Sequence, residues 1–367
     1  MTKHVIVLGA SGQVGTEVCL YLEQYSDLAV TAVARSAVSA AVLKRLGLTV
    51  RIGQLDGSDA DRTLLEGADL VVDFSVFSSE NSASLIDFYR KQNNRIFGAT
   101  KAECGFVFIS SINAFGMSEQ NNRAQYYWLP RSLYALTKRW GERYALRQAR
   151  AHARLAYVFR LGHVHGFLQS VSAETQRLLD STYQRFCYPD TPSYTVFCFS
   201  IAEAIALAAS GKLSMQRYTL ISAPVWSWAE VLQFYQREPQ PVQVVLEAPN
   251  TQAWHQLCLA AVKSALAKLV TKNRDLAVVW LSKFPKLYRR AQAKHYLNSA
   301  KIQLANAEQR AIYRAQGIHI GSIPGPFVPG LSDSRISMAA ARTAVAARIR
   351  EKLGHVLGDA EAPNNPY

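Results

Sequence analysis

The feature that most constrains the fold is a glycine-rich turn that follows the first apolar run of the chain. Residues 4–8 read His-Val-Ile-Val-Leu, and three glycines then follow in the spacing G-x-x-G-x-x-G ahead of a helical pattern. Such a turn lets the backbone approach a pyrophosphate, which binds the amide groups at the start of the helix. The alternative is a tight strand-to-helix turn that holds no ligand. The candidate binding residues are Gly9, Ser11, Gly12, Gln13, Val14 and Gly15.

Apolar runs and helical patterns alternate through the first half of the chain and predict an α/β protein with a doubly wound parallel sheet. The predicted strands are residues 4–8, 29–34, 49–52, 68–73, 105–110 and 155–160, with helices at 12–24 and 37–46. Further on, we expect helices at 172–180, 201–210 and 338–353, and strands at 195–199 and 218–222. Ligands bind such a sheet beyond the carboxyl ends of its strands, which is where the glycine turn lies.

A second motif lies more than a hundred residues after the first. Tyr134 and Lys138 have the spacing Tyr-x-x-x-Lys, and Ser111 ends the apolar run at 105–110. A tyrosine and a lysine four residues apart on a helix share one face, so the ammonium can act on the phenol and on a bound cofactor together. The alternative is a surface pair of side chains and an ordinary serine at a strand end. Either motif alone is weak evidence, so the interpretation depends on their occurring together in this order.

With these motifs the chain resembles the short-chain dehydrogenase/reductase superfamily, and in particular its extended branch, the NAD(P)-dependent epimerase/dehydratase family. The resemblance includes residues 110–116, Ser-Ser-Ile-Asn-Ala-Phe-Gly, and residues 160–166, Arg-Leu-Gly-His-Val-His-Gly. The second stretch is similar to the family segment R-P-G-x-V-Y-G, with leucine for proline and histidine for tyrosine. The resemblance covers roughly the first half to two-thirds of the chain. It implies a Rossmann-type NADP-binding domain at 1–166 and a smaller substrate lobe at 167–367, whose residues 195–222 contribute to the sheet.

The resemblance also implies hydride transfer between a nicotinamide and a carbon that bears oxygen. Tyr134 would exchange the proton of that oxygen, Ser111 would hydrogen-bond the oxygen as it gains charge, and Lys138 would hold the nicotinamide-ribose hydroxyls. Tyrosine is a poor base because its ordinary pKa is about 10. We therefore expect the Lys138 ammonium and the positive nicotinamide ring to lower the pKa of Tyr134.

The residue at the end of the second strand, about 20 residues past the turn, indicates which cofactor binds, because it contacts the ribose 2′ position. An acidic side chain there would bind the ribose 2′-hydroxyl of NAD, but this chain has Arg35. A guanidinium suits a 2′-phosphate, so NADP is preferred, with NAD as the alternative. The other explanation is an arginine solvated in a loop. Asp56 matches the family residue that contacts the adenine amine, with helix capping as the competing explanation.

Departures from the family narrow the reaction. Sugar 4,6-dehydratases carry an Asp-Glu pair where this chain has Ile112 and Asn113, so the resemblance favours epimerisation or carbonyl reduction over dehydration. Asn113, His163 and His165 are the substrate candidates, although a histidine pair of this kind is more often structural. We expect an NADP-dependent oxidoreductase or epimerase that acts on a hydroxyl or carbonyl group of a sugar nucleotide or a related metabolite. The alternatives are a reductase of a lipid-linked carbonyl and an NADP-binding sensor or scaffold without turnover.

Composition bounds the class of protein. The 367 residues, 49% of them hydrophobic, suffice for a full core, and no secretory signal or apolar stretch of about 20 residues is found. We therefore expect a cytoplasmic protein with a small-molecule substrate, and a homodimer is left open. The five cysteines are scattered and lack the spacing of a zinc site, which favours reduced, packed thiols and no metal: Cys19, Cys104, Cys187, Cys198 and Cys258.

Positive charge is concentrated in one segment. Residues 251–316 contain twelve lysines and arginines against two acidic residues, and so carry ten of the fourteen net positive charges. Apolar stretches that include Trp254 and Trp280 lie beside these charges. A helical segment of this kind can lie in the surface of an anionic membrane, and a helical lid over the substrate lobe is the alternative. Nucleic-acid binding is disfavoured because no binding module accompanies the charge.

Overall fold

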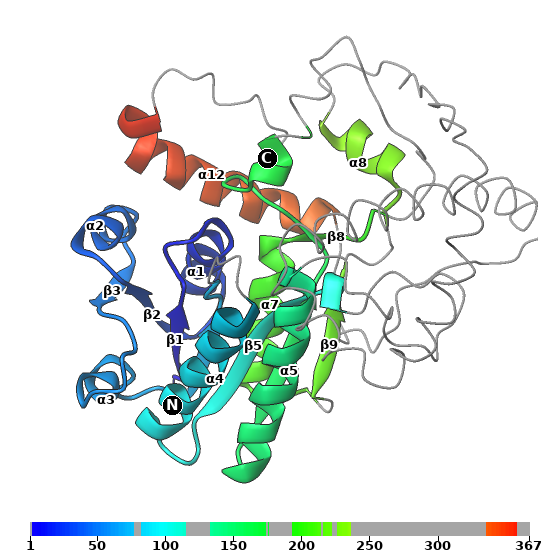
Figure 1. Ribbon diagram of the computed structural model, residues 1–367. Helices are drawn as coiled ribbons and strands as arrows, with labels where there is room; N and C mark the ends of the chain where they lie inside the picture. Colours follow the sequence, from blue (N-terminus) through cyan, green and yellow to red (C-terminus); the bar gives the residue numbers. More distant parts are fainter. Residues whose placement is uncertain are drawn as a thin grey trace, which may run out of the picture.

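The computed structural model describes residues 2–76, 82–114, 133–173, 175, 193–213, 216–221, 226–235 and 335–357. Its centre is a parallel sheet of seven strands in the order β3-β2-β1-β4-β5-β6-β9 (Figure 1). The strands are β1 His4–Leu8, β2 Ala29–Ala34, β3 Thr49–Ile52, β4 Leu70–Asp73, β5 Gly105–Ser111, β6 Ala156–Leu161 and β9 Arg217–Leu220. The predicted doubly wound parallel sheet is confirmed. The strand order reverses between β1 and β4, and ligands bind such sheets at this switch point.

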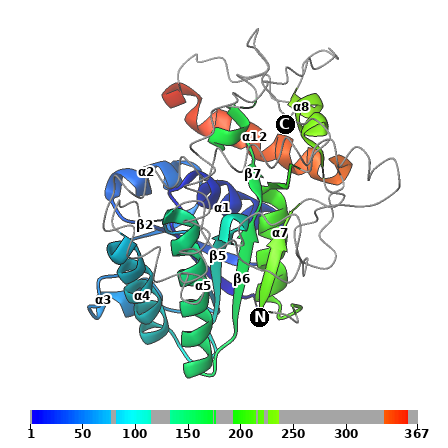
Figure 2. The ribbon, with the colours of Figure 1, turned by 45° about the vertical axis from the view of Figure 1, so that its right-hand side comes forward.

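Helices cover both faces of the sheet. They are α1 Gln13–Tyr25, α2 Ala37–Arg45, α3 Ala60–Leu64, α4 Ser82–Ala99, α5 Leu133–Ala151, α7 Cys198–Ala209, α8 Trp228–Tyr235 and α12 Arg335–Leu357, with a 3-10 turn at Ile112–Ala114. On one face α4 and α5 lie side by side, and on the other α1 packs against α7 while α12 crosses both (Figures 1 and 2). None of the helices in the described ranges is long and apolar enough to cross a bilayer.

Each face of the sheet has its own apolar core, which explains why the central strands read as continuous apolar runs. All seven residues of β5 are buried. One cluster joins the sheet to α1, α2, α7 and α12, with Leu20, Leu43 and Ile349 among its members. The other joins the sheet to α3, α4 and α5, with Leu64 and Phe97 among its members.

The strands after residue 160 differ from the prediction in extent and in place. The run predicted as a strand at 195–199 ends at Phe197, because Cys198 already begins α7; a short apolar run is compatible with either structure. The resulting strand, β8 Thr195–Phe197, pairs in parallel with β7 His163–His165 outside the main sheet. The strand predicted at 218–222 is β9, which lies beside β6 at the edge of the main sheet.

The two ranges predicted as domains share this sheet. β9, α7 and α12 come from the range 167–367, yet they pack on the sheet or on α1, as the predicted contribution of residues 195–222 implies. The glycine turn follows β1 and Ser111 ends β5, so both lie at the carboxyl edge of the sheet. The basic segment 251–316 lies outside the described residues, as does most of the helix predicted at 172–180.

Candidate functional site

The glycine turn closes tightly between β1 and α1. Gly9 has a φ of +71°, in the region that favours glycine, and its carbonyl accepts a hydrogen bond from the Gly12 N–H at 3.0 Å. A Cβ on Gly15 would lie 2.5 Å from the Gly9 carbonyl oxygen, so that position requires glycine. Gly12 is the N-cap of α1 and makes no side-chain cap hydrogen bond. This side-chain-free helix start fits the pyrophosphate of a dinucleotide, because backbone amides and the helix dipole both favour an anion there.

Two side chains of α1 join the turn to the segment after β7. The Gln13 Oε1 atom accepts a hydrogen bond from the Ser170 N–H at 3.2 Å. One turn further on, the buried Glu17 carboxylate accepts the N–H groups of Phe167 and Leu168 at 2.9 and 3.1 Å. Burial raises the pKa of Glu17, and these hydrogen bonds offset part of the rise. Sequence reasoning missed Glu17, whose signal is an acidic residue on the apolar face of the glycine-turn helix.

The structure brings Ser111, Tyr134 and Lys138 together at the carboxyl end of β5. The Ser111 hydroxyl lies close enough to the Tyr134 phenol to lower the pKa of that phenol, and Ser111 Oγ accepts the Asn113 N–H at 3.2 Å. Tyr134 is 41% exposed, whereas Lys138, one turn further along α5, is only 2% exposed. Lys138 Nζ donates to the Ile109 carbonyl at 2.8 Å. A surface pair of tyrosine and lysine is therefore excluded.

Burial governs the ionisation of these groups. It raises the pKa of the Tyr134 phenol, and the nearby Ser111 hydroxyl offsets part of the rise. Because the side chain is partly exposed, this desolvation is incomplete. Lys138 Nζ lies 5.7 Å from the centroid of the phenol ring and donates to the Ile109 carbonyl, so burial outweighs any lowering of the Tyr134 pKa by the ammonium alone. A lowered pKa with a nicotinamide bound stays a prediction. Burial lowers the pKa of Lys138 itself to about 8, and Asp73 and Glu142 oppose that fall.

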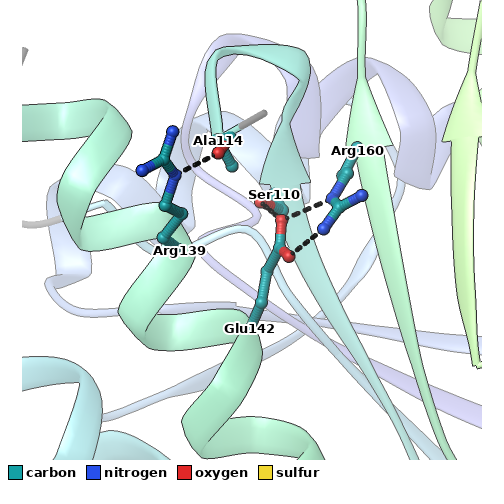
Figure 3. A network of polar contacts seen from close by, with 5 residues as sticks. All are labelled: Ser110, Ala114, Arg139, Glu142 and Arg160. Atoms are coloured by element: carbon teal, nitrogen blue, oxygen red, sulfur yellow. Dashed lines mark hydrogen bonds and ion pairs between the residues drawn. The ribbon is translucent and has the colours of Figure 1, made fainter. Parts of the chain in front are cut away.

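A buried ion pair fixes α5 to the two strands behind the site (Figure 3). Glu142 accepts hydrogen bonds from Ser110 Oγ at 2.6 Å and from Arg160 Nε and Nη2 at 2.8 and 2.6 Å. Arg139 adds a hydrogen bond from its guanidinium to the Ala114 carbonyl, just beyond β5. The helix of Tyr134 is thereby held against the strand of Ser111. Sequence reasoning missed this role of Glu142, which is four residues past Lys138 and therefore on the same helix face.

Arg35 and Asp56 follow the two strands at the other half of the carboxyl edge. Arg35 comes directly after β2 and is exposed, and the next residue, Ser36, caps α2 by accepting the Ser39 N–H at 3.2 Å. Asp56 follows β3 and accepts the Ser58 N–H at 2.8 Å, which helps to keep its pKa below the ordinary value. Asp59, rather than Asp56, is the N-cap of α3. Contacts of Arg35 and Asp56 with a dinucleotide stay predictions.

The three substrate candidates lie in different surroundings. Asn113 is exposed in the 3-10 turn beside Ser111, and His163 is exposed at the start of β7, with its ring 5.6 Å from that of Trp228. His165 is 0% exposed, and its Nδ1 atom lies 2.8 Å from the Tyr235 hydroxyl. Burial lowers the pKa of His165 to about 3, so the ring is neutral. This placement favours the structural explanation for His165.

One further acidic residue at this edge was missed by sequence reasoning. Asp73 ends β4, the strand between the glycine turn and Ser111, and is 1% exposed. Its Oδ1 atom accepts the Ser75 N–H at 2.8 Å. Burial raises the pKa of Asp73, and that hydrogen bond together with the charge of Lys138 opposes the rise. The available signal is a carboxylate that ends an apolar strand, Leu-Val-Val-Asp, at the ligand-binding edge.

Comparisons with known proteins agree with this fold. Solved structures with a similar fold include UDP-N-acetylglucosamine 4-epimerase from Bacillus cereus, with a TM-score of 0.52 and 15% identity, over 64% of this chain and 81% of that chain. UDP-glucose 4-epimerase from Thermotoga maritima has a TM-score of 0.50 and 15% identity, over 66% and 89%. The terminal R domain from the myxalamid PKS-NRPS biosynthetic pathway has a TM-score of 0.52 and 12% identity, over 77% and 78%.

These identities are low enough that the structures show the fold alone. A search of curated proteins finds no match. Residues 5–186, however, match the NAD dependent epimerase/dehydratase family, and that range contains the glycine turn, Ser111, Tyr134 and Lys138. Residues 5–186 therefore belong to the NAD dependent epimerase/dehydratase family, whose members are enzymes.

Proposed function

We propose that this protein is an NADP-dependent oxidoreductase or epimerase that acts on a hydroxyl or carbonyl group of a sugar nucleotide. The observation that carries the proposal is the position of Ser111 next to the Tyr134 phenol, beside the buried Lys138. This group lies at the end of β5, and the glycine turn lies at the end of β1, with only β4 between the two strands. A dinucleotide that lies along this edge spans both positions.

The side chains have separate tasks in this reaction. A nicotinamide dinucleotide, when bound, supplies or accepts the hydride. Tyr134 gives or takes the proton of the reacting oxygen, since its partly exposed phenol is open to a ligand, and the Ser111 hydroxyl stabilises charge on the same oxygen. Lys138 supplies a positive charge 5.7 Å from the centroid of the phenol ring. Glu142 binds Ser110 of β5 and Arg160 of β6 and so holds α5 against both strands, which keeps Tyr134 next to Ser111.

The choice of cofactor and the choice of substrate class are supported by different observations. Arg35 directly follows β2 and is exposed, which suits the 2′-phosphate of NADP, whereas the family description names NAD, the alternative cofactor. Two of the similar structures are described as epimerases of UDP sugars, which supports a sugar nucleotide as the substrate class. A lipid-linked carbonyl is a second candidate because of the basic segment 251–316. A scaffold without turnover is disfavoured, because binding alone has no use for the phenol.

Replacement of the phenol tests the proposal. Tyr134→Phe removes only the proton-transferring oxygen, so turnover should fall on the order of a hundred-fold or more while NADPH affinity stays within about two-fold. The matched control is Tyr144→Phe, the same change ten residues along α5, which should keep full turnover. Activity is measured as C4 epimerisation of UDP-glucose and UDP-N-acetylglucosamine, and as NADPH oxidation with keto-sugar nucleotides. If Tyr134→Phe keeps most of its turnover, Tyr134 is not the acid/base.

A further inference from the structure

Asp73 lies between the two halves of the proposed site. In the sheet register it is opposite Leu8 of β1 on one side and Phe108 of β5 on the other. Leu8 precedes the glycine turn, and a Cβ on Gly9 would lie 2.8 Å from the Phe74 carbonyl carbon, so the turn and the end of β4 are in close contact. Asp73 thus ends the strand that separates the glycine turn, after β1, from Ser111, at the end of β5.

The Asp73 carboxylate is buried with only one of its oxygens satisfied. The Oδ1 atom accepts the Ser75 N–H, whereas the Oδ2 atom is fully buried and meets no donor at ordinary hydrogen-bond geometry, although Gln92 of α4 lies close enough to lower the pKa of Asp73. A buried anion is costly unless a positive charge compensates it. Asp73 therefore stays charged only if a cation lies in the same low-dielectric surroundings.

The cation that faces it is Lys138. Its Nζ atom lies 5.3 Å from the centroid of the Phe108 ring, and Phe108 is the β5 residue opposite Asp73. A second ring, that of Tyr89 from α4, lies 5.4 Å from Nζ, and the Tyr89 hydroxyl donates to the Ser75 carbonyl at 3.4 Å. Lys138 and Asp73 are therefore both buried where β4, β5, α4 and α5 pack together, and the charge of each affects the pKa of the other.

The other titratable groups that face Lys138 do not replace Asp73. On α5, Tyr134 presents a neutral phenol ring, and Tyr89 from α4 is neutral because burial raises its pKa. Glu142 is negative, but Arg160 already neutralises it through two hydrogen bonds. Among the described residues, Asp73 is thus the acidic group near Lys138 that is not already held in an ion pair.

We propose that Asp73 is a positioning residue whose negative charge keeps the buried Lys138 ammonium protonated, so that Lys138 can hold a bound dinucleotide. This inference rests on the proposed function only for the role of Lys138 in cofactor binding. Burial alone favours a neutral amine, and Asp73 opposes it without touching the reacting atoms. With a pKa of about 8, Lys138 keeps about half of its charge at pH 8, and loss of the Asp73 charge lowers that fraction.

Asp73→Asn tests this directly, because it keeps the shape of the side chain and removes its charge. The matched control is Asp69→Asn, which removes the charge of an exposed residue just before the same strand. The pH titration of the Lys138 side chain is followed by NMR in protein that contains 15N-labelled lysine. Its signal is assigned as the one that is missing from the spectrum of Lys138→Arg. We expect Asp73→Asn to lower the Lys138 midpoint by at least about one pH unit and Asp69→Asn to leave it in place.

NADPH titrations provide the functional measurement. A shift of one unit reduces the charged fraction of Lys138 about five-fold at pH 8 but by only about a tenth at pH 6. The affinity of Asp73→Asn for NADPH should fall accordingly at pH 8 and stay close to that of the unmodified protein at pH 6. General damage to the site would lower the affinity at both pH values.

The outcomes separate the two proposals. An unchanged Lys138 midpoint in Asp73→Asn overturns the inference. A shifted midpoint with unchanged NADPH affinity supports the electrostatic pair and instead contradicts the role of Lys138 in cofactor binding. If Asp73→Asn does not fold, the 13C resonance of the Asp73 carboxyl in the unmodified protein should show a second inflection where Lys138 titrates, because coupled groups titrate together. Absence of that inflection also overturns the inference.

Discussion

At the scale of single residues, burial decides the chemistry of the Tyr-x-x-x-Lys motif. Tyr134 and Lys138 share a helix face, but one is 41% exposed and the other 2%. The lysine stem lies under the rings of Tyr89 and Phe108, so its charge is inside the protein while the phenol meets the surface. Desolvation therefore raises the pKa of the tyrosine and lowers that of the lysine.

The prediction on cofactor preference rests on one residue, Arg35. Because Arg35 lies where an acidic side chain would select NAD, NADPH should bind at least several-fold more tightly than NADH. Arg35→Asp should reverse or flatten this preference, while Arg62→Asp, the same charge reversal at an exposed position of α3, should leave it unchanged. Fluorescence titration with both nucleotides measures the ratio. Equal affinities in the unmodified protein would rule out the argument from Arg35.

At the scale of secondary-structure elements, the site depends on how closely α1 and α5 approach the strands. α1 approaches β1 through the glycine turn, and α5 is held to β5 and β6 by Glu142 and Arg160. Removing one partner of such a buried pair is expected to cost about 3–5 kcal/mol, because the other charge is left uncompensated. The two contacts place the cofactor turn and the phenol on the same edge of the sheet.

The glycine turn provides a test at this scale. In Gly15→Ala the new methyl group would meet the Gly9 carbonyl oxygen at 2.5 Å and the Ala10 Cα at 2.9 Å, both of them backbone atoms. We expect a loss of about 1–3 kcal/mol in the free energy of unfolding and at least a ten-fold loss of NADPH affinity. Gly98→Ala is the control, because no atom lies within 4 Å of a Cβ there and alanine favours the helix. Urea unfolding and NADPH titration measure both effects, and wild-type affinity in Gly15→Ala would contradict the assignment of the turn.

At the scale of the whole molecule, the chain returns to its first helix near its end. α12 packs against α1 and α7, and Arg348 of α12 donates to the Leu46 carbonyl at 2.9 Å and pairs with Glu23 of α1. The last described helix therefore belongs to the same layer as the glycine-turn helix. Residues 251–316, with most of the net positive charge, lie between α8 and α12 in the sequence and outside the described residues.

That charge carries a prediction from the sequence alone. Each basic residue near an anionic surface contributes about 1 kcal/mol, so the protein should co-sediment with anionic but not with neutral vesicles, and high salt should release it. Charge reversal at Lys283, Lys286, Arg289 and Arg290 should weaken binding. The control reverses four exposed charges of the sheet domain, Lys44, Arg45, Arg62 and Lys101. Failure to bind anionic vesicles at low salt would favour a lid over a soluble substrate.

The sequence by itself determined those features of the protein that depend only on residues close together in the chain. The strands at 29–34 and 49–52 have the predicted bounds, and the glycine turn lies between a strand and a helix as expected. These features follow from local periodicity and from the conformational freedom of glycine, both of which are visible in a short window. The Tyr-x-x-x-Lys spacing likewise placed both side chains on one face of a helix.

Only the tertiary structure decided which distant residues meet. Glu142 and Arg160 form their ion pair 18 residues apart, and Glu17 caps the Phe167 amide 150 residues away. Asp73 faces Lys138 only because β4 lies next to β5. The raised pKa of Tyr134 likewise comes from burial of the phenol. Burial and charge depend on what the rest of the chain packs around a group, and residue spacing carries no information on that packing.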